Sequence, residues 1–165
     1  MPLTMTEPVA DAILSELQNN LGAKLAALAV ALQPQLELPP PVEYAYGHSD
    51  FLLGFPVIQV DPVRVSGLNE DLRWQDQSKR VEIGIFVSNV RRDGLTRILD
   101  RYVRAVVEVL HERRKAGAFI GSSAAFDLEL DDEDIDYSPT TPQAGQFVRS
   151  VFIPVRATRR DTEAA

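Results

Sequence analysis

Residues 80–87, Arg-Val-Glu-Ile-Gly-Ile-Phe-Val, decide the fold because aliphatic side chains occupy every second position along them. Val81, Ile83, Ile85 and Val87 share one face of an extended chain, since β-strand side chains alternate between two faces. A periodicity of two over this length is the signature of a strand with one buried face. The stretch therefore predicts the clearest strand of the chain.

Two more strands are predicted upstream of it. Residues 42–46 alternate apolar and polar side chains and end at a glycine, and Phe55 to Val65 is rich in β-branched residues. Pro56 and Pro62 each lack an N–H, so the second of these strands should lie at a sheet edge or carry a bulge. Residues 66–80 are polar and predict an extended arm.

Two amphipathic helices are predicted around these strands. The first runs from Val9 to Leu32, where leucines and an isoleucine recur every three or four residues. Gly22 weakens its middle by about 1 kcal/mol relative to alanine. The second begins at Asp93, the predicted N-cap, and ends near Lys115. Its solvated side is predicted to hold Arg97, Asp100, Arg101, Arg104 and Glu108, with Asp100 and Arg104 forming a pair.

The C-terminal third predicts two closing strands. Residues 126–130 and 147–157 alternate apolar and polar side chains, and an acidic, proline-containing loop separates them at 132–145. From about residue 158 a charged, flexible tail is expected. The fold class that follows is α+β: a mostly antiparallel sheet of about five strands packed with two amphipathic helices, in one domain over residues 1–165.

The composition limits the function classes. The chain has 165 residues, 45% of them apolar, a net charge of −7, no cysteine and two histidines. Without cysteine, disulfides, thiolate zinc sites and cysteine nucleophiles are excluded. The acidic balance opposes nonspecific binding to nucleic acid or anionic lipid. We expect no membrane span and no signal peptide, and hence synthesis in the cytoplasm.

No recognisable catalytic motif is present. The densest carboxylates are Asp131, Asp132, Glu133, Asp134 and Asp136, but the run has no turn glycine and no later bidentate glutamate, as a calcium loop needs. Serine-nucleophile, phosphate-loop and dinucleotide motifs are also missing. We therefore expect no catalytic residue, no cofactor and no metal, and we interpret the carboxylates as a solvated turn or a surface that faces a partner.

Charged groups and one tryptophan are the candidate interface residues. Arg91 and Arg92 precede the second helix, Arg156 lies in the last strand, and Trp74 lies in the polar arm. Separate acidic and basic surfaces on one small domain suit a head-to-tail ring, in which each surface faces the neighbouring subunit. Trp74 either anchors such an interface or packs back onto its own core. The candidate interface residues are Trp74, Arg91, Arg92, Asp131, Asp132, Glu133, Asp134 and Arg156.

The order of these elements resembles the tail terminator, or tail completion, proteins of long-tailed bacteriophages and related minor tail proteins. The resemblance covers nearly the whole chain and rests on element order and hydrophobic texture. It implies a homohexameric ring that caps the tail tube at the tail–neck junction of the virion and offers a surface to the head–tail connector. DNA would only pass through the lumen, and no catalytic residue is implied.

Three alternatives remain open from the sequence. A neck protein that joins head to tail has a similar layout and differs in its binding partner. A metal-dependent hydrolase using residues 131–136 predicts tight binding of divalent cations. A small cytoplasmic binding protein predicts a one-to-one complex and no ring.

Overall fold

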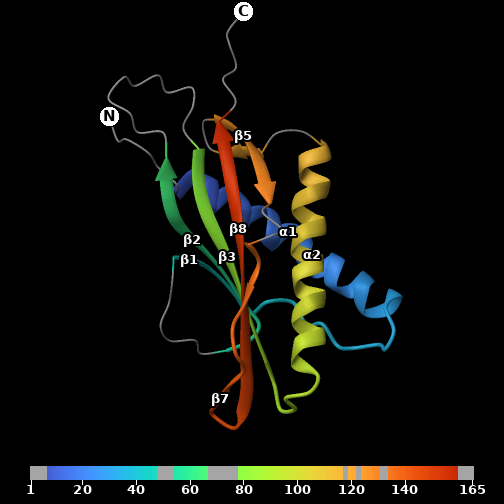
Figure 1. Ribbon diagram of the computed structural model, residues 1–165. Helices are drawn as coiled ribbons and strands as arrows, with labels where there is room; N and C mark the ends of the chain where they lie inside the picture. The colour runs from blue at the N-terminus through green and yellow to red at the C-terminus, as the bar shows by residue number, and fades with distance from the viewer. Residues whose placement is uncertain are drawn as a thin grey trace, which may run out of the picture.

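The computed structural model describes residues 7–47, 54–66, 78–116, 119–121, 124–130 and 134–159 (Figure 1). These residues form an eight-stranded sheet and two helices, which confirms the α+β class. The helices are α1 (Glu7–Ala31) and α2 (Leu95–Ala116). The strands are β1 (Glu43–Tyr46), β2 (Val57–Ser66), β3 (Ser78–Asn89), β4 (Phe119–Gly121), β5 (Ala124–Leu130), β6 (Asp136–Tyr137), β7 (Thr141–Gln143) and β8 (Gln146–Arg159).

The stretch that decides the fold lies in β3, and β8 runs antiparallel to it along its whole length. The register joins Ser78 to Thr158 at one end and Asn89 to Phe147 at the other. Within this pair Ile83 lies opposite Ile153, and both side chains are fully buried. Cross-strand apolar pairs of this kind stabilise a sheet and set its register.

Three short strands share the second edge of β8 in succession. β7, β6 and β5 pair in turn with its beginning, its middle and its end. The sheet order is therefore β1-β2-β3-β8-β5-β4, with β6 and β7 attached to β8. The prediction of about five strands was too low, because β6 and β7 lie inside the predicted loop 132–145 and are too short to show a periodicity.

The sheet contains parallel and antiparallel pairs, and Pro62 of β2 lies at a bulge. β1 runs parallel to β2, with Glu43 opposite Val57 and Tyr46 opposite Val60. β2 is therefore not an edge strand over these residues. The predicted bulge is confirmed, since the register between β2 and β3 shifts between Pro62 and Arg64. A bulge accommodates a residue that cannot donate to the ladder.

Both helices cover the same face of the sheet. α1 and α2 contact each other, and Figure 1 shows that they cross. The core joins the leucines of α1, the apolar face of α2 and the aliphatic face of β2, β3 and β8. The Tyr102 hydroxyl donates to the Pro39 carbonyl and links the chain after α1 to α2.

Among the described residues, neither helix is long and apolar enough to cross a membrane.

The ends of two elements differ from the prediction. Gly94, and not Asp93, is the N-cap of α2, because the Gly94 carbonyl accepts the first helical bond from Ile98 N at 3.2 Å. The Asp93 carboxylate instead lies 2.9 Å from Arg91 Nη2. β8 continues through Thr158, which was assigned to the tail, because it pairs with both β3 and β5.

Gly22→Ala should stabilise the protein. A Cβ at Gly22 would meet Pro40 Cβ at 3.8 Å, which is an ordinary contact. We expect a gain of about 0.5–1 kcal/mol in the free energy of unfolding, the usual difference between glycine and alanine inside a helix. Urea denaturation measures the change.

Gly84→Ala is the opposing variant. A Cβ at Gly84 would lie 2.9 Å from the Phe86 ring and 3.3 Å from the Phe152 ring, so the rings would have to move. Overpacking of this kind costs about 1 kcal/mol or more. A Gly84→Ala protein as stable as the parent would contradict the placement of the two rings.

Candidate functional site

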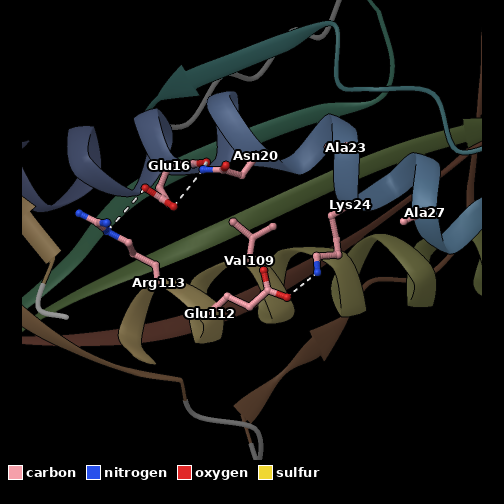
Figure 2. Close-up of a pocket in the computed structure, with 8 residues that line it drawn as sticks. All are labelled: Glu16, Asn20, Ala23, Lys24, Ala27, Val109, Glu112 and Arg113. Atoms are coloured by element: carbon pink, nitrogen blue, oxygen red, sulfur yellow. Dashed lines mark hydrogen bonds and ion pairs between the residues drawn. The ribbon is translucent and has the colours of Figure 1, made fainter. Parts of the chain in front are cut away.

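An open depression of about 420 Å³ lies between α1 and α2, and its charges are paired. Figure 2 shows Lys24 reaching from α1 to Glu112 of α2, with 2.5 Å between Nζ and Oε1. Arg113 approaches Glu16 across the same seam, with 3.8 Å between Nε and Oε2, and Asn20 donates to Glu16 at 2.9 Å. Cations and carboxylates therefore meet across the helices, and this surface serves mainly to join α1 to α2.

A second group of charges lies where β3, β8 and β5 pair. Arg156 sits opposite Arg80 on one side and opposite Glu129 on the other. The three line a depression of about 230 Å³, and Arg80 Nη2 lies 3.2 Å from Asp134 Oδ2. Asp134 thus pairs with Arg80, the residue opposite Arg156 in the sheet, although the sequence placed Asp134 and Arg156 in separate acidic and basic groups.

The remaining predicted interface residues fall in two places. Arg91 and Arg92 are exposed in the turn before α2. The ion pair of Arg91 with Asp93 joins side chains that are 79% and 70% exposed, and such pairs contribute about 0–1 kcal/mol. The other predicted interface residues lie outside the described residues: Trp74, Asp131, Asp132 and Glu133.

A groove runs beside the first half of α2, and we call it the α2 groove. Two adjoining depressions of about 650 and 360 Å³ form it, and both are lined by Leu36, Asn89 and Ile98. The turn before α2 contributes Val90, which is 70% exposed. Its further lining residues include Pro39, Phe55, Arg91, Asp93, Thr96, Arg97 and Asp100.

A polar cluster that was not predicted from the sequence joins the sheet to α2. The Tyr137 hydroxyl of β6 donates to Asp100 Oδ1 at 2.7 Å, and the Arg149 guanidinium lies 5.5 Å from the centre of the Tyr137 ring. Arg149 also donates to Thr96 Oγ1 at 2.6 Å. Burial raises the pKa of Tyr137 to about 12, helped by the bond to Asp100 and opposed by Arg149. No sequence signal indicates that β6 pairs with β8, so the cluster is visible only in the fold.

Two predicted features of α2 are wrong. Arg101, placed on the solvated side, is only 6% exposed. Arg104 pairs with Glu108 at 2.8 Å and not with Asp100, whose carboxylate accepts the Tyr137 hydroxyl. The second difference arises because β6 places Tyr137 beside Asp100, which the helical pattern alone does not show.

Among the described residues, the buried side chains of Gln59 and Arg101 have unsatisfied polar atoms. Gln59 is 1% exposed, and neither its Nε2 nor its Oε1 has a hydrogen-bond partner. The Nη1 of Arg101 also has none. A buried polar group without a partner costs about 1–3 kcal/mol, and a charged one costs more.

No three His, Asp or Glu side chains gather into a group that could hold a metal ion in the part of the chain that the structure describes. His111 is exposed near the end of α2.

No protein-family model and no curated protein sequence matches the chain. Solved chains that resemble it over most of its length include the following two. One belongs to a structure described as the virion of a native gene transfer agent particle, with a TM-score of 0.45, 11% identity, and coverage of 93% of this chain and 95% of that chain. The other carries no functional name, with a TM-score of 0.40, 12% identity, and coverage of 89% and 95%. At these values the likeness assigns neither a family nor a function.

Gln59→Met should stabilise the protein, because it removes the unpaired amide and keeps an unbranched side chain of similar size. We expect a gain of about 1 kcal/mol in the free energy of unfolding. Gln59→Glu is the matched variant and should be strongly destabilised by a buried charge. Equal stability of the two variants in urea denaturation would contradict the burial of Gln59.

Tyr137→Phe should flatten the loss of stability at alkaline pH. An unfolded tyrosine ionises near pH 10, whereas the folded pKa of Tyr137 is about 12. The raised pKa contributes stability that is fully present below about pH 10 and is lost as the pH rises towards about 12. Urea denaturation across this window should show a shallower decline in Tyr137→Phe than in the parent protein. A decline as steep as the parent's would contradict the assignment.

Proposed function

We propose that this chain is a structural subunit of a phage-like virion: a tail terminator that forms a ring on the end of the tail tube and joins it to the head. The support comes from the order of its elements and from the sheet edge formed by β1 and β2. One solved chain of similar outline belongs to a gene transfer agent virion, and a place in a virion is carried to this chain only as part of the proposal.

The sheet edge is the observation that carries the proposal. β1 ends opposite Val60, and β2 continues to Ser66 with β3 as its strand partner among the described residues. Two apolar side chains are exposed beside this edge, Val42 at 66% and Tyr46 at 48%. A sheet edge with exposed apolar side chains is a template for pairing with another chain, and in an assembly the partner covers it.

The charge balance fits a ring around a DNA channel. A net charge of −7 disfavours adhesion to the nucleic acid that would pass through the lumen. A neck protein that joins head to tail is the remaining structural candidate, and it differs by binding the connector and not the tail tube.

The ring itself can be tested by light scattering of the purified protein across dilution, with and without tail tube protein. We expect a defined ring, of about six copies if the resemblance holds, either alone or on the tube. A protein that stays monomeric with every tail component would overturn the proposal.

Lysine at both Val42 and Tyr46 should dissociate the ring without unfolding the subunit, because both side chains are exposed. Charges beside a sheet edge oppose strand pairing between subunits. Asn19→Lys, at an exposed position of α1, is the matched control and should leave the mass unchanged. A ring that survives the double substitution would show that this edge is not the contact.

A further inference from the structure

The path of paired strands through the sheet has two unlike ends, since it begins at β1 and ends at β4. Within the described ranges, β1 pairs with β2 alone and β4 pairs with β5 alone. The outer side of each terminal strand therefore presents backbone N–H and C=O groups that can pair with another strand. Figure 1 shows β2 and β5 on opposite sides of β8, so the two ends of the path point away from each other.

The part of the first edge that lies beyond β1 is protected against pairing. β2 continues past β1 from Asp61 to Ser66, and its register with β3 shifts between Pro62 and Arg64. Proline, charged residues and bulges are the devices that keep a sheet edge from adding a strand. This edge is therefore open to a partner at β1 and not along the rest of β2.

The two terminal strands contain almost none of these devices. β1 is Glu-Tyr-Ala-Tyr, with one charge at its first position, and β4 is Phe-Ile-Gly, with no charge. Neither strand contains proline. Their lengths of four and three residues are similar, so one strand can pair along nearly the whole of the other.

β1 and β4 run in the same sense. β2 is parallel to β1, and each of the four following steps, from β2 through β3, β8 and β5 to β4, is antiparallel. Four reversals restore the original sense, so β4 runs the same way as β1. A neighbouring copy that continues the sheet with its helices on the same face therefore adds its β1 parallel to β4.

A parallel pairing also brings unlike charges together, because the starts of the two strands then lie side by side. β1 starts at Glu43, which is exposed and takes part in none of the ion pairs found between described residues. In the sequence, Arg114 and Lys115 come shortly before β4. The acidic start of β1 in one copy and the basic approach to β4 in the next are thus complementary in charge, which favours this pairing and its direction.

We propose that β1 of one copy of this chain pairs in parallel with β4 of the next, so that the sheet continues from subunit to subunit around the ring. The contact joins two different surfaces of the chain, which is the head-to-tail arrangement that closes into a ring. Pairing of β1 with β1 of a second copy would instead be two-fold and would stop at a dimer. The inference rests on the proposed ring and specifies the surfaces that form it.

Disulfide trapping tests the pairing, because the chain has no cysteine of its own. Ala45→Cys is combined in turn with Phe119→Cys, Ile120→Cys and Gly121→Cys, three consecutive positions that cover both faces of β4 and a shift in register. Within one subunit β1 and β4 are five strand spacings apart, roughly 24 Å, which is too far for a disulfide. We expect at least one double variant to give, after mild oxidation, a ladder of covalent oligomers that ends at the size of the ring.

The single variants Ala45→Cys and Ile120→Cys are the matched controls and should remain monomers on non-reducing gels. A covalent dimer of Ala45→Cys alone would show that β1 pairs with itself and would overturn the inference. A ring that persists in light scattering while none of the double variants forms a ladder would also overturn it and would leave the proposed function standing. A parent protein that stays monomeric with every tail component would instead overturn the proposed function.

Discussion

The antiparallel pairing of β3 with β8 is the constraint on which the rest of the structure depends. It joins Ser78–Asn89 to Phe147–Thr158 without a break, so the aliphatic residues of both strands fall on one face. That face is the surface on which α1 and α2 pack, and it forms the centre of the core. A slip of one residue would turn each of these side chains away from the helices. The long strand β8 then offers its second edge to β7, β6 and β5.

The charges of the molecule divide into those that the fold pairs and those that it leaves open. The seam between α1 and α2 pairs Lys24 with Glu112, and the junction of β3, β5 and β8 pairs Arg80 with Asp134. These ion pairs form within the subunit. At the start of α2 the balance differs, because buried Arg101 has no described counterion. The sheet edge also leaves Val42 and Tyr46 exposed.

The elements with a long periodicity were predictable, and the short ones were not. The stripe of leucines in α1 and the alternation in β3 reflect burial of one face, so the sequence shows both directly. β6 and β7 contain two and three residues and exist because β8 supplies their hydrogen-bond partners. The same holds for the candidate site, of which one part was predictable from the sequence and another was not. The exposed arginines before α2 were identified, whereas the groove beside them depends on Leu36 and Phe55, distant residues that only the fold brings there.

By itself the sequence determined the α+β class, both helices, the central strand and the lack of cysteine chemistry, and it predicted either an edge position or a bulge for the strand that holds Pro62. Each of these follows from local spacing or from the covalent nature of a residue. The tertiary structure alone decided the strand order, the parallel pairing of β1 and the burial of Arg101 and Gln59. These depend on contacts between residues far apart in the chain. The helical pattern shows which face of α2 is apolar, but it does not show which other segments cover its polar side.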